Sequence, residues 1–115
     1  MGKLSKEELI NYFNIPSTEE LSNDKSCLYK KGIHPIPGRI YIFSHYVCFY
    51  SKNVVLNNEK LTLSISKIIK IKKTKSFGLI SNAIKLYLSD EKAYYFKNIK
   101  NRDSFYDEIR KLWKE

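Results

Sequence analysis

The sequence predicts a mainly β domain, in which seven short strands form a barrel or two crossed sheets and a C-terminal helix caps them. Three observations support this: segments rich in Ile, Val, Tyr, Phe and Leu recur in the middle of the chain, turn residues separate most of them, and the hydrophobic period is helical at both ends. A chain of 115 residues with 43% hydrophobic residues fits one domain. We expect 1–115 to be a single domain, with 1–12 as an N-terminal extension.

The segment 5–13 predicts a short N-terminal helix. Ser5 and Glu8 have the spacing of a capping box, in which each side chain bonds to the backbone of the other residue. One side of this helix is apolar and needs a surface to cover. That side carries Leu9, Tyr12 and Phe13.

From about residue 26 the hydrophobic period becomes that of β-strands. Seven consecutive short strands would expose their edges unless the sheet closes into a barrel or splits into two crossed sheets. No turn residue separates the fourth and fifth segments, so we expect a bend near Ser66. The predicted strands are 26–31, 38–43, 46–51, 60–66, 67–73, 82–88 and 92–97.

The predicted hairpin 38–51 is apolar on both faces. Ile40 and Ile42 share one face, whereas Tyr41 and Phe43 lie on the other. One face would line the barrel. We expect the N-terminal helix to cover the other, because its apolar stripe matches it; the alternative cover is a protein partner.

The last segment, 101–115, returns to a helical period. Acidic residues precede basic residues along it, which is the order that the helix dipole favours. Its apolar stripe would close an open end of the barrel. The stripe consists of Phe105, Ile109, Leu112 and Trp113.

The net charge of +9 is concentrated in the middle of the chain. Residues 25–89 hold twelve basic residues and a single acidic one, Glu59, whereas the two ends are close to neutral. Such a field favours an anionic partner: a membrane surface, a nucleic acid or an acidic protein. The alternative is a lysine-rich surface that only contacts water.

The basic run 67–76 leads into an apolar loop. Strand alternation would turn Ile69 and Ile71 inward, and the lysines outward or into the loop. An apolar tip ringed by ammonium groups can enter a membrane interface, where each lysine contributes about 1 kcal/mol; alternatively, the tip folds back into the core. The candidate lipid-binding residues are Lys70, Lys72, Lys73, Lys75, Phe77 and Leu79, together with a second cluster around the segment 32–38 that consists of Lys30, Lys31 and Arg39.

The sequence lacks the motifs of several other classes of protein. The chain contains no phosphate-cradling Gly-rich loop, nucleophile elbow or metal-ligand set, so it predicts no enzyme, metal or cofactor. Cys27 and Cys48 lie in apolar segments and are expected to be reduced core residues. No apolar run approaches the roughly 18 to 20 residues of a membrane span, and the charged N-terminus is unlike a signal peptide. A cytoplasmic location follows.

Several short motifs, in a fixed order along the chain, make the prediction of fold and function more specific. They are F-x-I-P-x-x-E-x-L (13–21), SCLY (26–29), GRIYI (38–42), VCFYS (47–51), LSISKIIKIKKTKS (63–76), NAIKL (82–86), YYF (94–96) and RDSFYDEIRKLW (102–113). In this order and spacing the chain resembles the GRAM domain family, whose fold is like that of pleckstrin homology domains. The stretches IKKTK, NAI and RD to LW look most like the GRAM domains of membrane-contact-site sterol-transfer proteins.

The chain departs from the family pattern at two places. Ser81 stands where the family usually has a proline before NAI, and 97–101 replaces a stretch that contains aromatic residues and serine. In pleckstrin-like domains the loop between the first two strands often holds a phosphoinositide headgroup, with a basic residue two positions before the arginine. Because Pro37 occupies that position, the resemblance favours phosphatidylserine or general anionic lipid over one specific phosphoinositide.

The resemblance and the charge together predict a cytoplasmic module that is peripheral at membranes and binds anionic phospholipids, phosphatidylserine or phosphoinositide. The alternative is a protein-interaction scaffold that uses the aromatic face of the hairpin or the C-terminal helix. Nucleic acid is the less favoured partner, because no recognised nucleic-acid motif is present.

Overall fold

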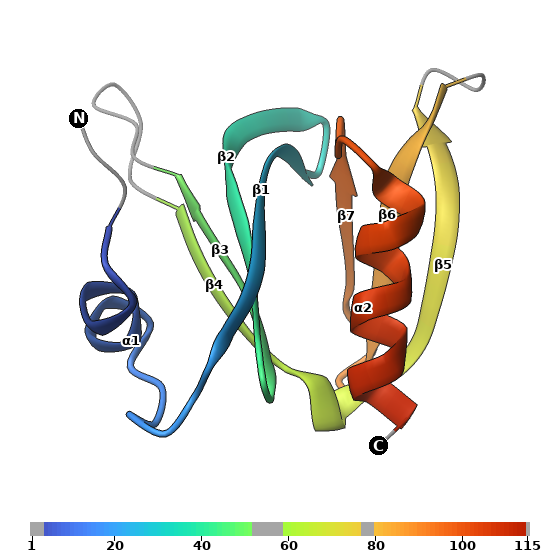
Figure 1. The fold of residues 1–115 in the computed structure, drawn as a ribbon. Helices are drawn as coiled ribbons and strands as arrows, with labels where there is room; N and C mark the ends of the chain where they lie inside the picture. Colours follow the sequence, from blue (N-terminus) through green and yellow to red (C-terminus); the bar gives the residue numbers. More distant parts are fainter. Residues whose placement is uncertain (1–3, 52–58, 77–79, 115) are drawn as a thin grey trace.

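The computed structural model describes residues 4–51, 59–76 and 80–114. It shows a seven-stranded antiparallel sheet in the order β4-β3-β2-β1-β7-β6-β5, curled into a half-barrel with helix α2 against its inner side (Figure 1). This confirms the predicted mainly β fold with a C-terminal helix. The elements are α1 (Lys6–Phe13), β1 (Leu21–Lys31), β2 (His34–Phe43), β3 (Tyr46–Ser51), β4 (Glu59–Ser64), the 3₁₀ turn η1 (Ile65–Lys67), β5 (Ile68–Ser76), β6 (Ile80–Leu88), β7 (Ala93–Lys97) and α2 (Arg102–Lys114).

Strands β1 and β2 are longer than predicted. They pair from Leu21 with Phe43 up to Lys31 with His34, so the hairpin includes residues that lie in a predicted connection. The prolines of β2 lie where this strand pairs with β1 alone, because its pairing with β3 begins at Arg39. A strand with one free edge tolerates residues without an amide hydrogen. Backbone pairing therefore extends past the apolar segment that marks the strand in the sequence.

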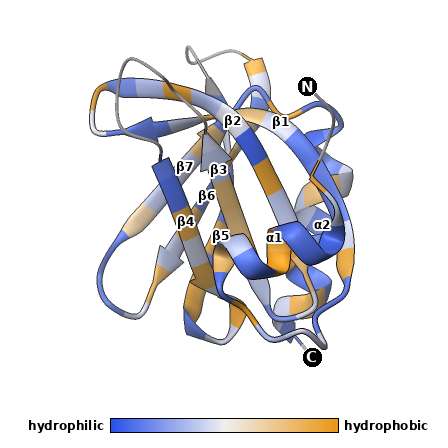
Figure 2. Cartoon of the chain, turned by 90° about the vertical axis from the view of Figure 1, so that its left-hand side faces the viewer, coloured by the Kyte–Doolittle hydropathy of each residue, from blue (hydrophilic) through white to orange (hydrophobic). Residues whose placement is uncertain are grey.

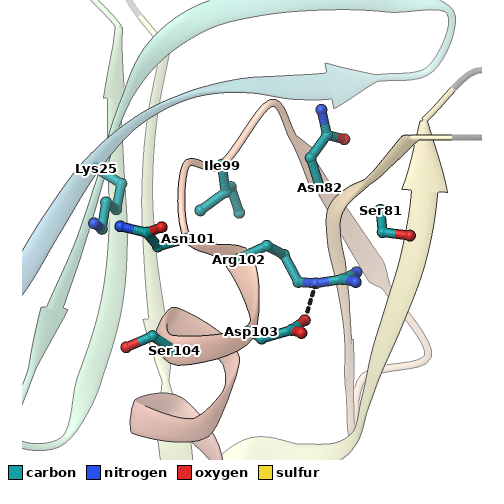
Figure 3. A pocket seen from close by; sticks show the side chains of 8 residues that line it. All are labelled: Lys25, Ser81, Asn82, Ile99, Asn101, Arg102, Asp103 and Ser104. Carbon is teal, nitrogen blue, oxygen red and sulfur yellow. Dashed lines mark hydrogen bonds and ion pairs between the residues drawn. The ribbon is translucent and has the colours of Figure 1, made fainter.

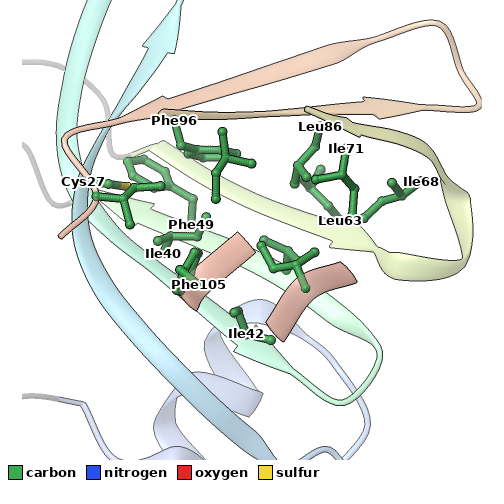
Figure 4. Packing of buried hydrophobic residues seen from close by; sticks show 14 of the residues in the cluster. Cys27, Ile40, Ile42, Phe49, Leu63, Ile68, Ile71, Leu86, Phe96 and Phe105 are labelled. Atoms are coloured by element: carbon green, nitrogen blue, oxygen red, sulfur yellow. The ribbon is translucent and has the colours of Figure 1, made fainter. Parts of the chain in front are cut away.

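The main core lies between the curled sheet and α2 (Figure 4). Phe105 and Ile109 of α2 are almost fully buried against aliphatic and aromatic side chains of the strands. Leu112 and Trp113 are half-buried at its edge, and the Trp113 indole Nε1 donates to the carbonyl of Ile68 at 2.7 Å. The predicted bend near Ser66 is confirmed as η1.

A second core forms on the outer face of the β2–β3 hairpin, under α1 (Figure 2). Leu9 and Phe13 pack with Tyr41 and Phe43, which confirms that the N-terminal helix covers the second apolar face. The capping box of α1 is present as predicted, and the helix ends at a left-handed asparagine. None of the described helices is long and apolar enough to span a bilayer.

We expect Gly38→Ala to lower the free energy of unfolding by about 3 kcal/mol, because the added methyl group overpacks a closed site. A Cβ there would lie 2.6 Å from Cζ of Phe49 and against the carbonyl oxygen of Tyr50. Urea unfolding measures this loss. Gly32→Ala is the control: its φ of +62° strains an alanine by about 1 kcal/mol, but its surroundings are empty. Equal losses for both variants would contradict crowding at Gly38.

Candidate functional site

Four side chains form a row across the strands β5, β6, β7 and β1. Lys72 pairs with Lys85, Lys85 pairs with Tyr95, and Tyr95 pairs with Lys30. Residues directly opposite each other in a ladder share one face of the sheet. We call Lys72, Lys85, Tyr95 and Lys30 the basic row.

The basic row lies on the outer face of the half-barrel. Its sequence neighbours Ile71, Leu86 and Phe96 are buried in the main core, so strand alternation turns the row away from α2. The two lysines at the ends of the row are exposed, and Lys85 and Tyr95 are half-buried. The row therefore presents its ammonium groups to solvent on the part of the outer face that neither α1 nor α2 covers.

The lysines of this face lie over tyrosine rings. Nζ of Lys30 is 5.7 Å from the ring centroid of Tyr95. Two register positions away from the row, and so on the same face, Tyr87 lies between Lys70 at 5.5 Å and Lys85 at 5.4 Å. Cation–π contacts of this kind hold an ammonium group in place without neutralising its charge.

No carboxylate in the described part of the chain forms an ion pair with Lys30, Lys70, Lys72 or Lys85. Like charges directly opposite each other in a sheet, such as Lys72 and Lys85, are destabilising. An anionic ligand would relieve this repulsion. The outer face is therefore a candidate anion-binding surface.

The other predicted residues of the 70–75 run have different positions. Lys73 turns to the inner side, where its Nζ lies 3.6 Å from the Asp103 carboxylate and 5.0 Å from the Tyr106 ring centroid. A hydrogen bond from Arg102 and the charge of Lys73 lower the pKa of Asp103. Lys75 is exposed, and its carbonyl accepts a hydrogen bond from the Tyr95 hydroxyl.

The predicted inward orientation of Ile69 is wrong. Its side chain is 61% exposed, whereas Ile68 and Ile71 are buried. The pairing with β6 shifts by one residue between Ile68 and Lys70, which is a β-bulge. The bulge places Ile69 in solvent and leaves Lys70 and Lys72 facing outward, as the sequence predicted.

The second predicted cluster separates into different environments. Nζ of Lys31 forms an ion pair with Glu59 at 3.1 Å, and the Arg39 guanidinium forms one with Asp24 at 2.8 Å. Only Lys30 of this cluster joins the basic row. Phe77 and Leu79 lie outside the described residues.

Sequence reasoning missed Lys85, Tyr87 and Tyr95 as parts of the site. The alternation of residues 84–88 did indicate that Lys85 and Tyr87 share an outward face. It could not indicate that β6 lies between β5 and β7, which brings these side chains beside the predicted lysines.

A pocket of about 620 Å³ lies where α2 begins (Figure 3). The Arg102 side chain is 8% exposed there and joins three elements. Its Nη1 donates to the carbonyls of Thr74 on β5 and Ala83 on β6, both at 2.8 Å, and its Nε donates to Asp103 at 2.7 Å. The lining residues are Lys25, Ser81, Asn82, Ile99, Asn101, Arg102, Asp103 and Ser104.

The two places where the sequence analysis expects departures from the family pattern both contribute to this pocket. Ser81 comes from β6, and Ile99 and Asn101 come from the connection between β7 and α2. The guanidinium in this pocket is already engaged by backbone carbonyls, so the pocket is mainly a polar hollow beside a structural arginine.

The aromatic face of the β2–β3 hairpin is not an open surface. Tyr41 is 6% exposed and Phe43 is fully buried, because α1 covers them. A partner that uses this face, which is one of the two surfaces in the alternative prediction, would have to displace α1. The apolar stripe of α2 is likewise turned toward the main core.

Cys27 and Cys48 are free and buried, as predicted. Burial raises the pKa of each thiol to about 12, so both are protonated and poorly nucleophilic near neutral pH. Among the described residues no group of His, Cys, Asp and Glu is arranged to hold a metal ion.

Comparison with known proteins identifies relatives along nearly the whole chain. The family model described as "GRAM domain" matches residues 7–115. The chain is 33% identical over 109 residues to the Arabidopsis thaliana Protein VASCULAR ASSOCIATED DEATH 1, chloroplastic, with 95% of this chain and 18% of that protein covered. It is 34% identical over 99 residues to human Protein Aster-B, with 86% and 13% covered. The chain thus spans less than a fifth of the length of these relatives.

Solved structures show the same fold at lower identity. The C-terminal domain of an unknown protein from Leishmania infantum matches with a TM-score of 0.80 and 23% identity, covering 93% of this chain and 95% of that one. The Vps36 N-terminal PH domain matches with a TM-score of 0.66 and 15% identity, covering 87% and 83%. The half-barrel is therefore a pleckstrin homology-like fold.

We expect Arg102→Met to lower the free energy of unfolding by about 3 kcal/mol, because the buried carbonyls of Thr74 and Ala83 lose a charged donor. Urea unfolding measures the change. Arg110→Met on the same helix is the matched control. It should cost less than about 1 kcal/mol, because the contacts of Arg110 with the described residues are a 3.5 Å contact to the Tyr106 hydroxyl and a cation–π contact with Trp113. Equal stability of the two variants would contradict the role of Arg102 in joining α2 to β5 and β6.

Proposed function

Because the chain belongs to the GRAM domain family, we propose that it is a non-catalytic module that docks onto anionic membrane surfaces. The contact is made by the basic row and by Lys70 beside it. The observation that carries the proposal is the opposition of Lys72 and Lys85 on a face that no described carboxylate neutralises. A charge arrangement that costs stability in the free domain is explained by an anionic partner.

The expected strength of this attraction is modest. Each lysine near an anionic bilayer contributes about 1 kcal/mol, so four lysines supply about 4 kcal/mol, which corresponds to a dissociation constant of about 1 mM. Docking through charge alone would be reversible. A module of this kind needs a second contribution, such as apolar insertion, to remain on a membrane.

The geometry of the row favours a lipid surface over a single headgroup. The row crosses four neighbouring strands, so its end lysines are about 14 Å apart at ordinary strand spacing. Its charges are ammonium groups, whereas Arg39 and Arg102 are engaged with protein groups. A spread of point charges suits several phosphatidylserine headgroups better than the convergent contacts of one specific phosphoinositide.

The tyrosines of this face are poor platforms for nucleic-acid bases. Bases of single-stranded nucleic acid stack on open aromatic faces. Tyr87 already has two lysines over its ring and Tyr95 has one. The contacts on the rings therefore favour a membrane over nucleic acid.

Sedimentation with vesicles should increase with phosphatidylserine content in a phosphatidylcholine background and should decrease with added salt. The physical reason is screening, since the Debye length falls from about 8 Å at physiological ionic strength to about 3 Å at 1 M. Co-sedimentation followed by gel densitometry measures the bound fraction. Binding that is indifferent to both phosphatidylserine and salt would contradict the proposal.

Lys70→Glu with Lys72→Glu should weaken binding to these vesicles by on the order of a hundredfold or more, because two attractions of about 1 kcal/mol each become repulsions. Lys67→Glu with Lys92→Glu is the matched control. It changes the net charge equally, and its exposed lysines lie in the β4–β5 and β6–β7 connections at the lower end of the sheet in Figure 1. If both double variants lose the same affinity, net charge and not the outer face governs docking.

A further inference from the structure

We propose that the apolar tip of the β1–β2 hairpin inserts into the bilayer interface beside the basic row. This inference rests on the proposed function and adds the apolar contribution that charge alone leaves missing. The residue that enters the bilayer is Ile33.

The Ile33 side chain is 84% exposed, the largest exposure among the large apolar residues that the structure describes. It lies in the two-residue turn between Lys31 and His34, next to Gly32 with a φ of +62°. A turn at a hairpin tip has little reason to carry a β-branched aliphatic residue, since water surrounds it. Isolated exposed apolar residues are nevertheless common, so the inference needs further support.

The first support is the charge around the tip. Lys30, which ends the basic row, and Lys31 immediately precede the turn. Glu59 is paired with Lys31, which leaves Lys30 as the cation that continues the outer face toward Ile33. An aliphatic side chain that extends from a cationic face matches a bilayer, where anionic headgroups overlie an apolar interior.

The second support is the position of the hairpin. It projects from the upper half of the molecule in both Figure 1 and Figure 2, and so does the end of β6 that begins at Ile80. Ile80 is 52% exposed. The hairpin tip and the start of β6 therefore lie in the same half of the domain, and each carries an exposed isoleucine.

The third support is the rigidity of the tip. Backbone pairing between β1 and β2 continues without interruption from Asn23 to the last pair, Lys31 with His34. The Lys31–Glu59 ion pair also ties the hairpin to β4. A preformed apolar projection loses little conformational entropy when it inserts. Most of the free energy gained by burying it therefore contributes to the binding affinity.

A single environment-sensitive probe tests insertion directly. Ile33→Cys can be labelled selectively with a nitrobenzoxadiazole dye, because Cys27 and Cys48 are buried and protonated. On vesicles of phosphatidylcholine and phosphatidylserine, its emission should rise and shift to the blue, and lipids brominated on their acyl chains should quench it. The control probe at Ser89→Cys, exposed in the β6–β7 connection, should show neither change.

The affinity for the same vesicles should fall about tenfold in Ile33→Ser, since a buried isoleucine is replaced by a polar side chain. Leu4→Ser is the matched control, because it replaces another exposed aliphatic residue with the same polar one just before α1, which covers β2 and β3 and not the basic row; its affinity should stay at the wild-type value. Urea unfolding confirms that both variants are folded.

The outcomes separate this inference from the proposed function. Wild-type protein that does not sediment with the vesicles overturns both. The result that overturns only hairpin insertion is binding of the wild-type protein with no fluorescence change of the probe at position 33 and full affinity of Ile33→Ser. A loss of affinity in Leu4→Ser and not in Ile33→Ser also overturns it, because the side of the domain that α1 covers would then be the part that enters the lipid.

Discussion

The packing of α2 against the inner side of the curled sheet is the interaction on which the rest of the structure depends. A single-layer sheet has an apolar side that must be covered, and Phe105 and Ile109 of α2 fill it. At the two ends of the helix, Arg102 and Trp113 each donate a hydrogen bond to a carbonyl of the edge strand β5. Because α2 occupies the inner side, outward residues of β5, β6, β7 and β1 are the ones that can form a binding surface.

The helix α1 has a comparable effect on the other half of the sheet. The β2–β3 hairpin carries apolar side chains on both faces, and α1 seals the outer one with its own stripe. This removes the aromatic surface that would otherwise suit a protein partner. The two helices thus divide the sheet into a sealed half and an open half. The open half carries the lysines that no described carboxylate neutralises.

Membrane docking by this domain would combine two weak contributions. In the proposed docking, the basic row would supply electrostatic attraction that salt can screen, and the hairpin tip would supply apolar burial that salt does not weaken. Neither contribution requires a deep pocket, which fits a site made of a sheet face and a turn. The chain corresponds to less than a fifth of the length of its relatives Protein VASCULAR ASSOCIATED DEATH 1 and Protein Aster-B.

The sequence alone determined the features that depend on local order: the capping box at Ser5, the alternating strands, the bend near Ser66 and the amphipathic last helix. It also indicated the outward direction of Lys70 and Lys72. Only the tertiary structure decided that Lys30 meets Tyr95, that a bulge exposes Ile69, and that Lys73 turns to Asp103. The physical reason is that local periodicity specifies which face a side chain occupies within its own strand, whereas strand order and register arise from hydrogen bonds between segments far apart in the chain.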